Sequence, residues 1–441
     1  MQLMRTLLVI SVCGLLLPFA SCKKYDTKAT QKTTSNLNFI KDWSKVNGGS
    51  SYDHYWSGAA TSDGGYIAVG YTSSMDGDFS GFKGGTDALV VKYDAGGNKI
   101  WHTLIGGSEQ DYATAVRQLS DGSYIGTGYS QSKDGNITSN HGGRDALLFK
   151  LSADGTIQWV KALGSTANEA ARSMVVNADG TFTLAGYRTD ATDAITSFDA
   201  WLCKVDQSGN PLWEKTYGGS NADNVFSIAT DGNGGYIFTG YSSSTDGDAN
   251  GNSGGLPDYW IVKIDAMGNK QWHKTYGGSG SDWAHDIVKT TNGYVIIGMS
   301  SSTDGDITGQ HGKLDAWVLK IDNNGNKIWQ KTFGGSNNDH GQGILSTSDG
   351  SLFIGVNSQS ADGSFTSSLG YMDAWVVKLD ENGNNLGQKE LGGSGNDEIF
   401  GFAGDNNRYC LFGSTNSSDG DIAGYQVDFF RNAWTLEFQD K

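Results

Sequence analysis

A short run that reads Asp-Ala-Trp, or a close variant of it, recurs seven times along the chain and constrains the fold more than any other feature. A second ladder, which consists of tryptophans, has the same period, with Gly387 at its seventh place. Agreement of two ladders over most of the chain indicates a repeat architecture. The first ladder starts at Asp87, Asp145, Asp199, Asp258, Asp315, Asp373 and Asn432, and the second comprises Trp43, Trp101, Trp159, Trp213, Trp272 and Trp329.

Each repeat contains four strand signals. In the fifth repeat these are residues 284–290, 294–298, 315–322 and 327–333, and a long loop over 300–314 separates the second from the third. The turns between them are rich in Asn, Asp and Gly, which accept positive φ, and the runs themselves are β-branched and apolar. Four-stranded units at this spacing predict an all-β protein, a β-propeller with seven blades.

The repeat count also predicts how the ring closes. The last repeat has three strand signals, at residues 398–403, 409–414 and 433–438. The segment 39–46 precedes the first full repeat and matches a fourth strand. We expect it to complete the last blade, which would leave no free sheet edge. An open solenoid is the alternative.

These motifs resemble the bacterial seven-bladed β-propeller repeat (SBBP-type) family. The resemblance rests on Asp-Gly-Gly-Tyr-Ile from Asp63, Asp-Ala-Trp-Val-Val-Lys-Leu-Asp from Asp373 and Trp-x-Lys-Thr-Tyr-Gly-Gly-Ser from Trp272. It covers roughly residues 39–441. It implies the fold, and it implies no shared activity or cofactor.

The N-terminal segment reads as a processing signal. Arg5 precedes an apolar run that is short for a membrane span, and Phe19-Ala-Ser-Cys22 resembles a bacterial lipobox. The resemblance implies that residues 1–21 are a lipoprotein signal peptide and that Cys22 is acylated. Residues 22–38 are polar and predict a flexible tether, followed by the propeller over 39–441. We therefore expect a lipid-anchored outer-membrane protein, at the cell surface or on the periplasmic side; a simple secretory peptide is the alternative.

Charge narrows the range of partners. The chain carries 48 Asp and Glu against 32 Lys and Arg, a net charge of −16. This argues against a nucleic-acid partner, whose phosphates need a basic surface, and against docking on anionic lipid, so the N-terminal lipid is the only membrane contact we expect. We expect a monomer. Cys203 and Cys410 occupy different places in their repeats, which argues against a disulfide framework.

Two acidic patterns recur in the loops. Successive connections alternate between the two faces of a propeller, so the long loops and the glycine loops between blades share one face, where function is expected. The acids that end the glycine loops could ring the channel mouth and hold a cation, or each could accept backbone N–H bonds in its own turn. They are Asp53, Asp111, Asp223, Asp282, Asp339 and Asp397, with Asn168 in the third repeat.

The long loops carry Ser-x-Asp-Gly-Asp. We expect no cofactor, but Ca²⁺ at this motif stays open beside a turn interpretation, because two carboxylates supply few of the six to eight oxygens that calcium needs. The metal candidates are Asp76, Asp78, Asp246, Asp248, Asp304, Asp306, Asp419 and Asp421.

Aromatic and imidazole side chains that do not repeat follow the glycine-loop acids. An aromatic floor beside carboxylates could stack on a sugar ring, and packing around the channel is the alternative. The candidate ligand-binding residues are His54, Tyr55, Trp56, Tyr112, Trp283, His285 and His340.

The sequence shows no catalytic signature such as a nucleophile elbow or a zinc-ligand pair. The leading hypothesis is therefore a binding scaffold for a glycan or protein at the long-loop face. A polysaccharide-degrading enzyme that uses paired carboxylates and a structural subunit of a surface complex are the alternatives.

Overall fold

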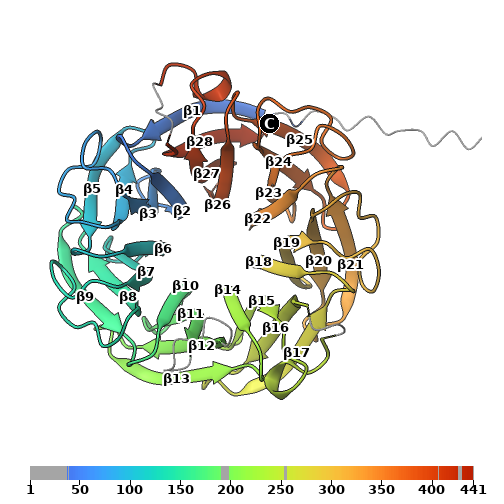
Figure 1. Ribbon diagram of the computed structural model, residues 1–441, viewed down its shortest axis with the longest axis horizontal. Coiled ribbons are helices and arrows are strands. Elements are labelled where there is room, and N and C mark those ends of the chain that lie inside the picture. The colour runs from blue at the N-terminus through green and yellow to red at the C-terminus, as the bar shows by residue number, and fades with distance from the viewer. Residues whose placement is uncertain are drawn as a thin grey trace, which may run out of the picture. The chain divides into compact units, whose positions relative to one another are not determined.

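Seven four-stranded antiparallel sheets stand side by side as the blades of a ring, and the innermost strands surround its centre (Figure 1). The computed structural model describes residues 37, 39–189, 198–252, 256–405, 407–425 and 430–440. Residues 34–441 form one compact unit. The predicted seven-bladed propeller is confirmed. Cys22, the signal peptide and all of the tether except Leu37 lie outside the described residues. No helix in the described part of the chain is long and apolar enough to cross a membrane.

Each blade is named here from its innermost strand outward. Blade one comprises β2 (Asp53–Ala60), β3 (Tyr66–Thr72), β4 (Asp87–Tyr93) and β5 (Lys99–Ile105), and blade two β6 (Asp111–Gln118), β7 (Tyr124–Ser130), β8 (Asp145–Leu151) and β9 (Ile157–Leu163). Blade three comprises β10 (Glu169–Val176), β11 (Phe182–Thr189), β12 (Phe198–Val205) and β13 (Pro211–Tyr217), and blade four β14 (Asp223–Thr230), β15 (Tyr236–Ser242), β16 (Asp258–Ile264) and β17 (Lys270–Tyr276). Blade five comprises β18 (Asp282–Thr290), β19 (Gly293–Ser300), β20 (Asp315–Ile321) and β21 (Lys327–Phe333), and blade six β22 (Asp339–Ser346), β23 (Leu352–Ser358), β24 (Asp373–Leu379) and β25 (Asn385–Leu391). Blade seven comprises β26 (Asp397–Asp405), β27 (Arg408–Thr415), β28 (Asn432–Asp440) and β1 (Phe39–Asn47), and the 3-10 turns η1 (Gly247–Ala249) and η2 (Gly420–Ile422) lie in long loops.

The hydrophobic core lies between neighbouring blades. All seven residues of β4 and of β20 are buried, because both faces of these middle strands are covered by adjacent sheets. One apolar cluster, for example, joins Val69 and Val90 of blade one to Leu147 and Phe149 of blade two. The continuous apolar runs in the sequence follow from this two-sided burial.

β1 closes the ring as the sequence predicts. It pairs with β28 in antiparallel register, with Phe39 opposite Asp440 and Val46 opposite Trp434. The Phe39 ring stacks on Phe438 with centroids 4.5 Å apart. Segments far apart in the chain thus form one sheet. β1 pairs with the edge of β28 that would otherwise be free.

Candidate functional site

Every innermost strand carries a β-bulge at the same place, three residues after its first residue. The register shifts, for example, between Tyr55 and Ser57 in β2 and between Ala284 and Asp286 in β18. A bulge inserts one unpaired residue and re-aims its side chain. The seven side chains at this place, called here the bulge ring, are Trp56, Thr114, Arg172, Phe226, His285, Gln342 and Phe400.

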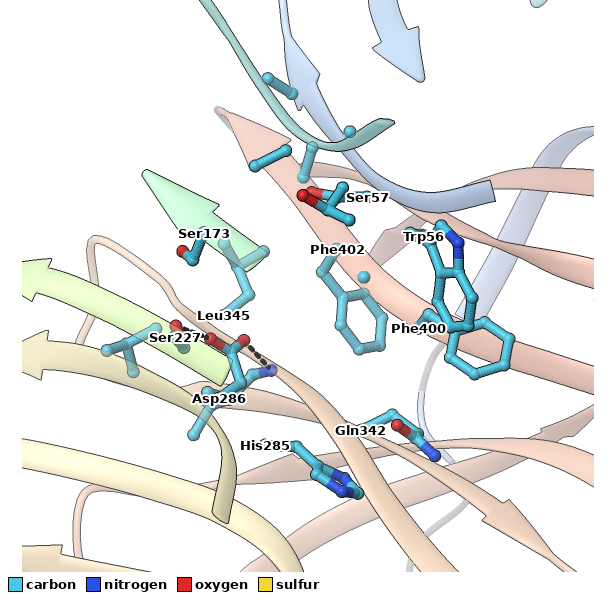
Figure 2. Close-up of a pocket in the computed structure, with 18 of the residues that line it drawn as sticks. Trp56, Ser57, Ser173, Ser227, His285, Asp286, Gln342, Leu345, Phe400 and Phe402 are labelled. Carbon is cyan, nitrogen blue, oxygen red and sulfur yellow. Dashed lines mark hydrogen bonds between the residues drawn. The ribbon is translucent and has the colours of Figure 1, made fainter. Parts of the chain in front are cut away.

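The bulge ring lines a cavity of about 400 Å³ in the central channel, and all seven innermost strands contribute to its wall. Figure 2 shows Trp56, Phe400 and Phe402 on one side of it and Asp286 and Ser227 on another. The volume lies within the range of small-ligand pockets. Because the residue type varies among the seven positions, with Phe at two of them, the wall is asymmetric although the scaffold repeats.

An aromatic cluster forms the blade-one side of the wall. The Trp56 ring lies 4.2 Å from the His54 ring and 5.0 Å from the Phe400 ring, measured between centroids. His54 packs behind Trp56 and is buried, and burial lowers its pKa to about 3, so it is neutral at physiological pH. Trp56 and Phe400 are only half-buried, which leaves apolar ring surface facing the cavity.

Polar groups form the opposite side. The Asp286 carboxylate accepts hydrogen bonds from Ser227 Oγ at 2.8 Å and Ile344 N at 3.1 Å, so it ties blades four and six to blade five. Burial raises its pKa, and the positive charge of Arg117 opposes that rise. His285 donates from Nδ1 to Gly341 O at 2.7 Å, and burial lowers its pKa to about 4. Among the described residues that line this cavity, Asp286 is the only carboxylate, so a pair of catalytic acids is not assembled there.

The other aromatic candidates lie around this cavity or away from it. Tyr55 is fully buried, and its hydroxyl lies 2.7 Å from the Tyr93 hydroxyl, so it belongs to the core. Tyr112 packs 4.7 Å from Tyr129, and Trp283 stacks 4.7 Å from Tyr241. His340 is half-buried, and burial lowers its pKa. Of the seven candidates, Trp56 and His285 line the cavity and His54 supports Trp56.

The glycine-loop acids are buried and hold their own loops. Asp53 Oδ2 accepts hydrogen bonds from Gly49 N and from Ser74 Oγ, both at 2.8 Å. The same pair of contacts recurs in five other blades, at Asp111, Asp223, Asp282, Asp339 and Asp397. The assignment of Asn168 to this place in blade three is wrong. Glu169 begins β10 and accepts Ser165 N there, because its longer side chain reaches back to the loop.

The Ser-x-Asp-Gly-Asp loops clasp the same glycine loops. Asp76 Oδ1 accepts a hydrogen bond from Ser50 N at 2.8 Å, and Asp78 Oδ2 accepts one from Gly48 N at 3.0 Å. Within the described ranges no group of three or more His, Cys, Asp or Glu side chains is placed to hold a metal ion. Calcium binding stays a prediction. Asp248 instead accepts a hydrogen bond from the Lys270 side chain. The other acids of these loops likewise accept hydrogen bonds from backbone N–H groups of the glycine loops; they are Asp246, Asp304, Asp306, Asp419 and Asp421.

Sequence reasoning missed five members of the bulge ring. A signal for them was present, since each lies three residues after the first residue of an innermost strand, at a place where the residue type varies between blades. The five are Thr114, Arg172, Phe226, Gln342 and Phe400.

No protein-family model matches the chain. The resemblance to the bacterial repeat family therefore stays an expectation. The chain is 24% identical over 367 residues to the regulatory protein FlaEY of Caulobacter vibrioides. The match takes in 73% of this chain and spans 38% of the length of that protein.

Two solved propellers are similar in structure. The WD40 β-propeller domain of Doa1 matches with a TM-score of 0.51 and 10% identity, over 92% of this chain and 98% of that one. The WD40 domain of Pan2 from Neurospora crassa matches with a TM-score of 0.49 and 9% identity, over 91% and 95% of the two chains. The first likeness supports the propeller fold and nothing beyond it.

Proposed function

We propose that the protein is a lipid-anchored propeller that binds a short glycan in its central channel, with the long-loop face as the way in. The observation that carries this proposal is the bulge ring, seven side chains of six residue types around one cavity. The residues that repeat in every blade form the scaffold. The residues that vary between blades make the cavity wall asymmetric, and an asymmetric wall can recognise a specific ligand. The half-buried faces of Trp56 and Phe400 suit the C–H face of a sugar, and Gln342 supplies amide donors and acceptors.

Several features support a small ligand rather than a flat protein contact. The cavity of about 400 Å³ is concave and lies within the ring of innermost strands. It places aromatic surface on one side and hydrogen-bonding groups on the other, as small-ligand sites do. The lipid anchor is proposed at Cys22, which would hold the binding domain at the outer membrane.

The glycan proposal is tested with purified residues 23–441 on a broad glycan array, followed by titration calorimetry. We expect Trp56→Ala to weaken binding of the best glycan by roughly tenfold, about 1.4 kcal/mol, because one face of the sugar loses its platform. Tyr371→Ala is the control, because Tyr371 is 71% exposed and is not among the residues that line the cavity. Absence of any bound glycan would reject the proposal, and a protein captured specifically from membranes would favour a protein partner.

Anchoring is tested separately from binding. We expect the full chain to incorporate a labelled fatty acid in a bacterial host and to fractionate with the outer membrane. Cys22→Ala is expected to abolish both. An unlabelled wild-type protein released into the medium would instead support a simple secretory peptide.

A further inference from the structure

A second pocket opens on the long-loop side of blades two, three and four. Its volume is about 510 Å³, and two arginines, Arg144 and Arg172, lie in its wall beside Tyr187 and Phe198. Arg172 belongs to the bulge ring and lines the channel cavity as well. Arg172 therefore links the wall of the channel cavity to the wall of this second pocket.

These two arginines have no carboxylate partner among the described residues, although the chain carries a net charge of −16. Three other arginines are paired: Arg188 with Glu169 and Glu214, Arg408 with Glu437, and Arg431 with Glu398. In addition, the Nε atoms of Arg144 and Arg172 are buried, and neither has a hydrogen-bond acceptor within the described part of the chain. A buried N–H donor of a charged group that lacks an acceptor costs free energy, and an anionic ligand that accepts from it would recover this cost.

Aromatic rings hold both guanidinium groups in place. The Arg144 guanidinium lies 4.7 Å from the Tyr129 ring centroid, and its Nη1 donates to the Tyr187 hydroxyl at 2.5 Å. The Arg172 guanidinium lies 5.6 to 5.9 Å from the centroids of Tyr129, Tyr187 and Phe226. Stacking satisfies the planar faces of an arginine and leaves edge donors for a planar anion such as a carboxylate. The pocket is thus arranged before any ligand arrives.

We infer that the glycan is acidic and that Arg144 and Arg172 bind its anionic group, a carboxylate or a sulfate, while neighbouring sugars occupy the channel. This inference rests on the proposed glycan function. The chain's overall negative charge repels long polyanions, so the ligand is a short oligosaccharide with few charges. Gln131 and Asn224 also line the pocket and can serve the hydroxyls beside the anionic group.

The test uses an array that carries uronic-acid, sulfated and neutral oligosaccharides, and then titration of residues 23–441 with the best acidic binder and its uncharged counterpart. For a uronic acid, the counterpart is the methyl ester. We expect the acidic form to bind at least tenfold more tightly. We expect Arg144→Gln to remove most of that preference while leaving the affinity for the uncharged form within about twofold. Arg172→Gln should also remove most of the preference, and because Arg172 lines the channel cavity it should weaken binding of the uncharged form too.

Lys389→Gln is the charge-matched control, because Lys389 is exposed on the outer strand of blade six and lies outside both pockets. Arg172→Lys keeps the charge but not the planar fork, and should retain part of the preference. Thermal unfolding checks that each variant is folded. Equal binding of acidic and uncharged forms, or a preference that survives both Gln variants, overturns the inference and leaves the glycan proposal standing. Binding to no sugar of any kind overturns both.

Discussion

Buried acidic side chains meet at the joint between neighbouring blades. Asp87 begins the third strand of blade one, and Asp111 begins the first strand of blade two. Asp87 Oδ2 accepts Lys83 N at 2.7 Å, and Asp111 Oδ2 accepts Gly107 N at 2.9 Å. A Cβ at Gly106 would lie 2.2 Å from Asp87 Oδ1 and 2.7 Å from Asp111 Oδ2, so only glycine fits between them. The first glycine of the recurring Gly-Gly pair is explained by this close approach.

The pH dependence of stability follows from the same joint. Burial, together with the charge of Asp111, raises the pKa of Asp87 from 3.8 to about 6. The folded state then binds more protons than the unfolded state between these values, so stability from this group falls as pH rises from about 4 to 6. We expect Asp87→Asn to be more stable than wild type at pH 7.5, by on the order of 1 kcal/mol after solvent screening. The chain itself carries Asn432 at the equivalent place in blade seven.

Urea unfolding at pH 4.5 and pH 7.5 measures this effect. Asp94→Asn is a control of opposite sign, because Asn98 and Gly96 donate to Asp94 and lower its pKa, which makes its charge favourable above about pH 4. That variant should lose stability at pH 7.5. If Asp87→Asn were no more stable than wild type at that pH, the proposed cost of the buried charge would be refuted.

At the scale of single strands, the repeat makes the strands and the long loops predictable from the sequence, but it does not reveal the β-bulge. Turns rich in Gly and Asn mark the strand ends, and the period places the long loops. The bulge is invisible in the spacing, because all seven innermost strands contain the same extra residue and the period does not change. For the same reason the sequence does not show that Trp56 and Phe400, far apart in the chain, lie side by side. The packing of blade one against blade seven brings these two rings together, and the spacing of the repeats in the sequence does not show it.

The outer strands are held by tryptophans that dock on the next blade. Trp101 of β5 in blade one packs on the turn between β8 and β9 of blade two, and its Nε1 donates to Ala153 O at 3.2 Å. Gly155 lies in that turn with φ +84°, and a Cβ there would be 2.6 Å from the Trp101 ring. Glycine is therefore required at residue 155 for two reasons, the positive φ of the backbone and the close approach of the Trp101 indole.

A matched pair of glycine substitutions separates these two effects. Gly350 has the same φ of +84°, with nothing within 4 Å of a Cβ. We expect Gly350→Ala to cost about 1 kcal/mol, from the left-handed backbone alone. Gly155→Ala should cost at least about 1 kcal/mol more, because the indole must move. Denaturant unfolding of both variants measures the difference, and equal costs would show that docking does not constrain the turn.

For the whole molecule, ring closure explains where the tryptophan ladder breaks. Each outer-strand tryptophan needs the turn between the third and outer strands of the following blade. In blade seven these strands are β28 and β1, which come from distant parts of the chain and share no turn. Blade six, whose outer strand is β25, therefore has no such turn to receive an indole, and Gly387 stands at that place. The single irregularity in the ladder thus marks the seam of the ring.

The seam predicts the outcome of moving β1. In a chain that begins at residue 48 and carries residues 37–47 after residue 441, joined by a copy of the turn 322–326, β1 follows β28 as every other outer strand follows its neighbour. The register supports this, since Phe39 lies opposite Asp440. We expect this permutant to be monomeric and to unfold within a few degrees of residues 37–441, as measured by light scattering and thermal unfolding.

Deletion of residues 37–47 without the transfer should behave differently. It exposes the edge of β28 and removes the Phe39–Phe438 stack and the burial of Val46 from the core of blade seven. We expect a loss on the order of 5 kcal/mol or more, with association through the free edge. Since the permutant and the deletion differ only in β1 and the turn that joins it, a deletion that is as stable and as monomeric as the permutant would mean that blade seven does not need its fourth strand. In that case the channel cavity would need only the six complete blades and β26, which is the blade-seven strand that lines it, and would not need a closed ring.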